Sequence, residues 1–155
     1  MEEKGKDIDF NFTPQKGVGK ILFSFNEKDV LKILGTPTER SVDVFFDNEY
    51  AIYLDYYNSY DSHLSVNLYF ENNILDYLSI YTNDIILDNF QFSLYHQDEI
   101  LSFIKKYHDV HKLDFVEKEE YNKNTKEIFY DYDNIGLAIW FDKSGISGIC
   151  VQKTT

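Results

Sequence analysis

Tyrosines and acids recur at every second position in several short segments of the chain. In residues 50–57, Tyr53, Asp55 and Tyr57 alternate with other side chains, most of them apolar. Tyrosine is a rigid, amphipathic side chain that protein-binding surfaces use as an anchor, and a carboxylate attracts cationic groups. The pattern therefore predicts recognition of a basic partner rather than bond-making chemistry.

The charge of the chain favours the same class of partner. Among 155 residues, 27 Asp and Glu oppose 15 Lys and Arg, which gives a formal net charge of −12. No Lys or Arg occurs between Arg40 and Lys105, and eleven acids do. A nucleotide bias toward A and T would enrich lysine, so such a bias does not explain this gap. An acidic surface repels phosphate backbones and anionic membranes, so we expect no nucleic acid and no membrane as partner.

Few residues have the spacing of a metal or cofactor site. His108, Asp109 and His111 could hold a metal by spacing, but the sequence implies no third strong ligand there. Residues 131–142 resemble a calcium-binding loop, but Ile135 occupies a position that must supply oxygen. We therefore expect no metal, no cofactor and no catalytic residue.

The single cysteine, Cys150, excludes a disulfide within the chain, and its apolar segment indicates a packing residue. Residues 1–7 lead into no apolar stretch of signal-peptide length. No segment reaches the roughly 18 to 20 apolar residues that a bilayer-spanning helix needs. We expect one cytoplasmic domain over residues 1–155, present as a monomer or weak dimer.

The elements that must position these side chains occur in two similar sets. A shift of 71 residues places the alternating apolar residues of 64–70 on those of 135–141. The same shift places Leu78 and Ile80 on Ile149 and Val151. This similarity predicts two internal repeats, at about 23–84 and 92–153.

Each repeat begins with a helix signal. Ser24 and Glu27 have the spacing of a capping box, and Gly35 followed by Pro37 ends the first helix. The second helix begins near Asp98. Its predicted inward residues are Ile100, Leu101, Ile104 and Tyr107.

Strands follow each helix, and the short turns between them imply antiparallel pairing. The strands are expected at 42–46, 50–57, 64–70, 74–81, 113–118, 127–132, 135–141 and 146–152, with an additional N-terminal strand near 7–12. We therefore expect an α+β fold. Two tandem helix-plus-antiparallel-strand repeats form one sheet of about eight strands, with the helices on one face.

Period-two alternation sends the polar and aromatic residues to the sheet face that the helices leave uncovered. The predicted partner-binding residues are Tyr53, Asp55, Tyr57, Tyr60, Asp61, Tyr69, Tyr77, Tyr81, Asp131 and Trp140. For each aromatic residue, cross-strand packing without any partner stays an open alternative.

Residues 23–37 read Phe-Ser-Phe-Asn-Glu-Lys-Asp-Val-Leu-Lys-Ile-Leu-Gly-Thr-Pro and precede tyrosine-rich hairpins. This segment resembles the opening of β-lactamase-inhibitor-like domains, in which such a helix precedes antiparallel strands. Tandem copies in that family form a long curved sheet whose open face grips a partner protein, so the resemblance implies the same use here. The small acidic chain also resembles bacterial immunity proteins of contact-dependent growth inhibition and related polymorphic toxin systems, whose toxins are commonly basic nucleases.

Three functional hypotheses follow. The leading one is a non-enzymatic immunity protein that binds and neutralises a basic toxin, with a nuclease domain as the expected partner. The second is an intracellular scaffold or assembly module that binds a peptide or subunit through its sheet. The third, a small-molecule enzyme, requires a deep pocket around Asp55 and Asp131.

Overall fold

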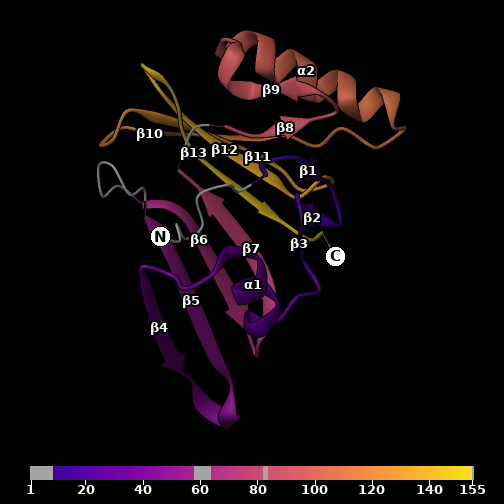
Figure 1. Cartoon of the computed structure of the whole chain (residues 1–155). Helices are drawn as coiled ribbons and strands as arrows, with labels where there is room; N and C mark the ends of the chain where they lie inside the picture. Colours follow the sequence, from indigo (N-terminus) through magenta and orange to yellow (C-terminus); the bar gives the residue numbers. More distant parts are fainter. Residues whose placement is uncertain (1–8, 58–63, 82–83, 155) are drawn as a thin grey trace, which may run out of the picture.

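The computed structural model describes residues 9–57, 64–81 and 84–154. Within these residues, the fold is one large antiparallel sheet of eight strands, with α1 and α2 and two small sheets packed against it (Figure 1). The large sheet consists of β4 (Glu39–Val44), β5 (Tyr50–Tyr57), β6 (Leu64–Glu71), β7 (Ile74–Ile80), β10 (Lys118–Asn122), β11 (Glu127–Tyr132), β12 (Leu137–Asp142) and β13 (Gly145–Gln152). The other elements are β1 (Phe12–Thr13), β2 (Gly17–Val18), β3 (Ile21–Leu22), α1 (Glu27–Leu34), β8 (Ile86–Leu87), β9 (Phe90–Gln91) and α2 (Gln97–Val110). The expected α+β class and the eight-stranded sheet are confirmed.

The strand order divides the sheet into two halves that meet in the middle. The order is β10-β11-β12-β13-β7-β6-β5-β4, so each half is a four-stranded antiparallel meander. The halves join where β13 pairs antiparallel with β7, with Ile149 opposite Ile80 and Val151 opposite Leu78. All four of these side chains are buried, and one continuous core therefore runs through both halves.

The central hairpins of the two halves have the same register at the 71-residue shift. The equivalent buried pairs are Leu68 with Leu78 and Ile139 with Ile149. The register also shifts at equivalent places, directly after Tyr69 in β6 and directly after Trp140 in β12. This equivalence supports the predicted repeat, which stays a prediction.

Helix α1 begins two residues later than the sequence predicted. The cap is Asn26 rather than Ser24: its side chain accepts a hydrogen bond from the Asp29 backbone N–H (2.9 Å), and the Asp29 carboxylate accepts from the Asn26 N–H (3.2 Å). Asn with Asp three residues later forms the same reciprocal cap as Ser with Glu. The helix ends at Gly35, as predicted, where φ is 78° and glycine avoids the strain of a Cβ.

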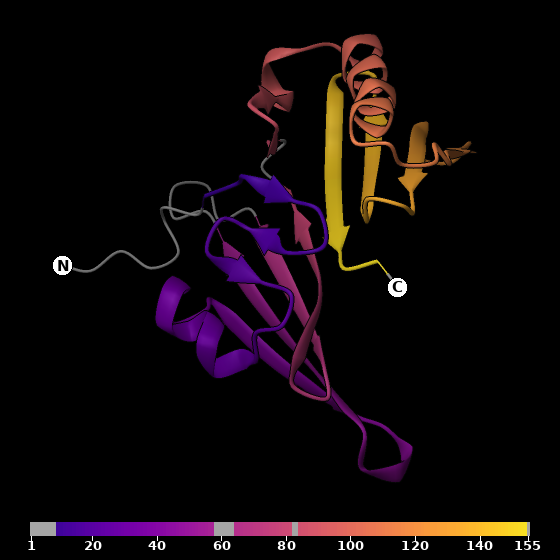
Figure 2. The ribbon, with the colours of Figure 1, turned by 90° about the vertical axis from the view of Figure 1, so that its right-hand side faces the viewer.

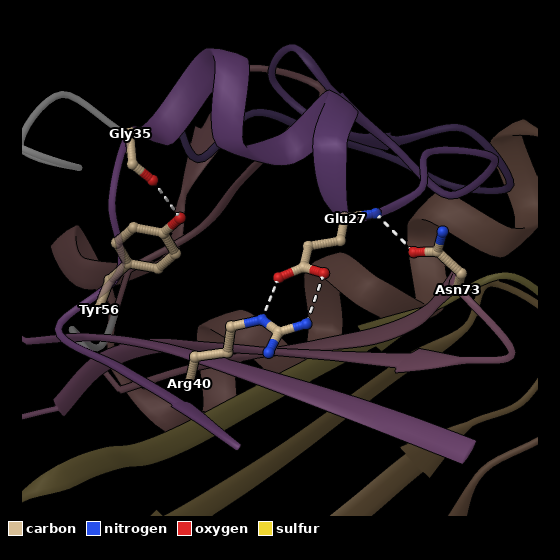
Figure 3. A network of polar contacts seen from close by, with 5 residues as sticks. All are labelled: Glu27, Gly35, Arg40, Tyr56 and Asn73. Atoms are coloured by element: carbon tan, nitrogen blue, oxygen red, sulfur yellow. Dashed lines mark hydrogen bonds and ion pairs between the residues drawn. The ribbon is translucent and has the colours of Figure 1, made fainter. Parts of the chain in front are cut away.

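Polar contacts hold α1 over the half formed by β4–β7 (Figure 3). The Tyr56 hydroxyl donates to the Gly35 carbonyl at the end of the helix (2.8 Å). At its start, the Glu27 N–H donates to the Asn73 side-chain oxygen (3.0 Å), and the Arg40 guanidinium pairs with the Glu27 carboxylate. The helix therefore covers the sheet face to which Tyr56 points.

Helix α2 covers the other half from the same side. Ile100, Ile104 and Tyr107 are buried as predicted, whereas Leu101 is only partly buried. The Gln97 side chain contacts the Tyr130 hydroxyl (3.4 Å) on β11, whose buried side chains continue the core face of β12, β13 and β7. Both helices therefore lie on one face of the sheet, each against its own half (Figures 1 and 2). The small sheets add Phe12, Val18, Ile21 and Leu87 to the same core.

Three predicted strands have different bounds in the structure. The strand expected at 113–118 begins at Lys118, because Phe115 packs edge-on against the His108 ring (5.1 Å between centroids) and closes the end of α2 instead. The strand expected at 42–46 ends at Val44, since the chain turns at Phe46–Asn48, where two successive residues have positive φ. The N-terminal strand near 7–12 is the two-residue β1, and residues 1–8 lie outside the described part.

Candidate functional site

The sheet face turned away from α1 and α2 is called the open face here. Along β5, Ile52, Leu54 and Tyr56 are buried on the helix side, and Tyr53 and Asp55 alternate with them at partial exposure. The predicted alternation is therefore observed. In the described part of the chain, both helices pack on the opposite face, so these side chains border solvent.

Three tyrosines form a row of neighbouring rings across the open face of the first half. Tyr53 lies opposite Tyr69, and Tyr69 opposite Tyr77, on adjacent strands. Their ring centroids are 5.0 Å apart in the first pair and 4.8 Å in the second, which is nearly parallel at 19°. Burial raises the pKa of Tyr77 to about 12, so its hydroxyl is neutral at physiological pH. We call these residues the tyrosine row.

The second half carries a different aromatic pair. The Trp140 and Phe129 rings lie 4.6 Å apart on adjacent strands, and both are partly exposed. Trp140 also lies opposite Gly148, where a Cβ would be 3.8 Å from the indole. The sequence prediction missed Phe129, although its position two residues before Asp131 places it on the same face of β11.

Between these aromatic groups runs a band of small side chains. Asn67, Ser79, Cys150 and Ala138 lie opposite one another on four successive strands. Cys150 therefore faces the open face rather than the core. Burial raises its pKa to about 11, so it is a neutral thiol at physiological pH and a packing residue, as the sequence indicated.

An aspartate stands at each end of this band. Asp55 lies opposite Asn67, whose side-chain amide donates a hydrogen bond to the Asp55 carboxylate. Asp131 lies opposite Ala138, which has no donor. Partial burial and the nearby Asp133 carboxylate raise the pKa of Asp131 above its ordinary value. The two acids thus occupy equivalent places but differ in how their charge is stabilised.

The structure does not bring Asp55 and Asp131 together. Four strands separate them, namely β6, β7, β13 and β12. A groove of about 760 Å³ lies between the start of α2 and the β12–β13 hairpin, and a hollow of about 490 Å³ lies at β10–β12. Neither is lined by Asp55 or Asp131, so the geometry that the enzyme hypothesis required is not found in either cavity.

The remaining predicted residues lie at the margins of the open face. The Tyr57 hydroxyl donates to the Glu39 carboxylate (2.9 Å) on the edge strand β4, and this bond raises the pKa of Tyr57. Tyr81 follows the end of β7 and is 45% exposed. Tyr60 and Asp61 lie outside the described residues.

The cations that border the lysine-free segment point away from the open face. Arg40 turns to the helix side and pairs with Glu27. Lys105 is on α2, with its ammonium 5.8 Å from the Phe115 ring centre. On the β10 edge, Lys118 lies opposite Asp131 and pairs with Asp133 (3.2 Å). The open face of β5–β7 is therefore acidic and aromatic over the residues that the structure describes.

The histidines considered as metal ligands are separated. The His108 ring is buried, with Nδ1 on the Ile104 carbonyl (2.8 Å), whereas His111 pairs with Asp88 (2.7 Å). Across residues 9–57, 64–81 and 84–154, no group of three or more His, Cys, Asp or Glu is arranged to hold a metal ion.

The sequence prediction also missed an exposed apolar tip. The hairpin that joins β4 to β5 projects from the sheet (Figure 2), and it carries Val44 at 77% and Phe46 at 91% exposure. The strand predicted at 42–46 contained Val44 and Phe46, so the prediction did not place them at an exposed tip. Asp47 and Asn48 predicted the turn itself, but the predicted strand extended to Phe46 instead of ending at Val44.

Comparisons with protein-family models, curated proteins and solved structures find no match to this chain. Among the described residues, no helix is both long enough and apolar enough to cross a membrane.

Proposed function

We propose that the chain is a cytoplasmic, non-enzymatic immunity protein that binds a basic protein toxin through the open face and blocks its active site or substrate groove. The observation that carries this proposal is the placement of aromatic rings and carboxylates together on one uncovered sheet face. The proposed contacts are Tyr53, Asp55, Tyr57, Tyr69, Tyr77, Tyr81, Asp131 and Trp140.

The charge distribution is the first argument. The face of β5–β7 carries Asp55 with the exposed acids of β4 beside it, while Arg40 is paired on the opposite side. Acidic side chains can take the places of nucleic acid phosphates in the cationic groove of a nuclease. Such a field also speeds association with a cationic partner and disfavours acidic ones.

The aromatic rings are the second argument. The tyrosine row and the Trp140–Phe129 pair are held by ring contacts between adjacent strands, so they lose little rotamer freedom on binding. Rigid tyrosine and tryptophan side chains in the centre of an interface commonly contribute most of its binding free energy. An acidic face with preordered rings suits a tight complex with a basic protein.

The test is calorimetric titration of the purified chain with the basic protein encoded by the adjacent gene, over a series of salt concentrations. We expect a complex whose affinity falls steeply as salt increases. The double variant Asp55→Asn/Asp131→Asn should weaken binding by about tenfold or more, mainly through slower association.

The matched control is Asp109→Asn/Asp114→Asn, which removes the same charge from exposed residues of α2 and the segment after it. It should bind nearly as the unmodified chain does. The absence of a complex, or an affinity that does not change with salt concentration, contradicts the proposal. A salt-independent complex would favour the scaffold hypothesis, in which the sheet binds a peptide or subunit without strong positive charge.

A further inference from the structure

The hollow of about 490 Å³ on β10–β12 is a recess of the open face in which aromatic side chains and carboxylates lie together. It is lined by Glu120, Asn122, Glu127, Phe129 and Trp140, together with Tyr121 and Lys123. We propose that this hollow binds the guanidinium group of one arginine side chain of the basic partner. The inference rests on the proposed function and names the chemistry of one contact within it.

Two carboxylates of the hollow are placed on the same side of the sheet as the aromatic pair. Glu120 lies directly opposite Phe129 in the register of β10 and β11. Glu127 precedes Phe129 by two residues on β11, so it shares the same face. The Ser147 hydroxyl donates to the Glu127 carboxylate (2.6 Å), which fixes that acid beside the rings. Lys123 contributes one ammonium against these two carboxylates.

The shape of the walls favours a guanidinium over an ammonium. The Trp140 and Phe129 rings are flat surfaces 4.6 Å apart, inclined at 39°. A guanidinium is planar, stacks on aromatic faces and donates paired hydrogen bonds to a carboxylate, whereas an ammonium is a compact, strongly hydrated charge. Arginine can therefore stack its plane on an exposed ring face while it donates paired hydrogen bonds to a carboxylate.

The first half of the sheet carries different side chains at the places equivalent to this hollow. Where β11 has Glu127 two residues before Phe129, β5 has Ala51 two residues before Tyr53. Where Trp140 faces Gly148, Tyr69 faces Tyr77 and stacks on it. The first half thus presents a continuous ring surface, and the second presents a charged recess.

The experiment uses Trp140, the single tryptophan of the chain, as the reporter. The full chain is titrated with a short, terminally blocked peptide that carries one arginine, and with matched peptides that carry lysine or citrulline. We expect a saturable change in Trp140 emission with the arginine peptide. The lysine peptide should bind about tenfold more weakly, and the uncharged citrulline peptide should give no saturable change.

Variants locate the binding site. Glu120→Gln and Glu127→Gln should each lower the affinity for the arginine peptide by about tenfold, because each variant loses a charge-assisted hydrogen bond to the guanidinium. Asp109→Asn on α2 removes the same charge elsewhere and should leave peptide binding unchanged. Far-UV circular dichroism checks that all variants fold.

Equal binding of the arginine and citrulline peptides, or unchanged binding by both Glu variants, overturns the inference. So does the absence of any saturable signal. If the salt-dependent complex with the basic partner still forms in those cases, the proposed function stands and the arginine site is wrong. Conversely, arginine binding without that complex supports the site and contradicts the function.

Discussion

The two halves of the sheet share their core and differ on their outer surface. On the helix side, β6–β7 and β12–β13 place buried aliphatic pairs in the same register. The buried tyrosines Tyr56 and Tyr132 are also similar, since each hydroxyl donates to an acceptor at 2.8 Å and 2.7 Å respectively. On the open face, the tyrosine row in one half contrasts with a recessed Trp140–Phe129 pair in the other.

This contrast separates what the fold requires from what it leaves free. The inner positions are fixed by close packing, because a change of even one methylene there leaves a void or a clash. The outer positions meet fewer constraints, so the two halves carry different side chains on the same backbone. Under the proposed function, the open face differs between the halves because its residues contact a partner rather than the core.

The largest effect is expected from breaking the shared core in each half. Leu68→Ala and Ile139→Ala truncate fully buried residues at equivalent positions. Each should lower the free energy of unfolding by about 2 to 5 kcal/mol, from lost apolar burial and the cavity left behind. Urea unfolding followed by Trp140 fluorescence and by far-UV circular dichroism measures both variants.

Because β7 pairs with β13, we expect the two halves to unfold together. Leu68→Ala should therefore shift the Trp140 transition although it lies in the other half, and both probes should coincide. The exposed Val44→Ala is the control and should change stability by less than about 0.5 kcal/mol. Two separate transitions would show that the halves are independent units.

A smaller effect is expected from the two equivalent aspartates. Asp131→Asn should raise the free energy of unfolding at pH 7 by less than about 1 kcal/mol, because the ionised carboxylate is partly buried beside Asp133 while solvent screens it. Asp55→Asn should not stabilise the fold, since Asn67 already donates to Asp55.

The stability gain expected from Asp131→Asn depends on pH in a defined direction. The pKa of Asp131 is raised in the folded state. The stabilisation of the fold by the protonated Asp131 carboxyl is therefore fully present below its ordinary pKa, and it is lost as pH rises through the folded pKa. The gain from Asp131→Asn should therefore vanish near about pH 3 and develop above it. Thermal unfolding of Asp131→Asn and the unmodified chain at about pH 3 and at pH 7 tests this prediction. An equal gain in stability at the two pH values would contradict it.

The alternation of apolar residues along the chain and the positions of turn residues predicted most of the fold. Alternation identified β5, β6, β7, β11, β12 and β13, because one buried face imposes a strict period of two. The apolar residues at 113–116 could not be told from a strand, since their partner is the end of α2 and not a neighbouring strand. Ser24 and Asn26 are both good caps, and only the contacts of the chain decide between them.

The sequence predicted which residues lie on the open face, but it did not predict the hollow on that face. The alternation placed Tyr53, Asp55 and Trp140 on the open face from sequence alone. The hollow depends on Gly148 lying opposite Trp140 and on Glu120 lying opposite Phe129. These pairings come from the register between strands, which single-strand periodicity does not give.

The most direct test of the central claim is hydroxyl-radical footprinting of the chain, alone and bound to the basic protein encoded by the adjacent gene. We predict that oxidation of Tyr69, Tyr77 and Trp140 falls several-fold in the complex. Tyr95, which is 42% exposed beside the start of α2, should be oxidised equally in both states. Protection of Tyr95 with no change on the open face would contradict the account.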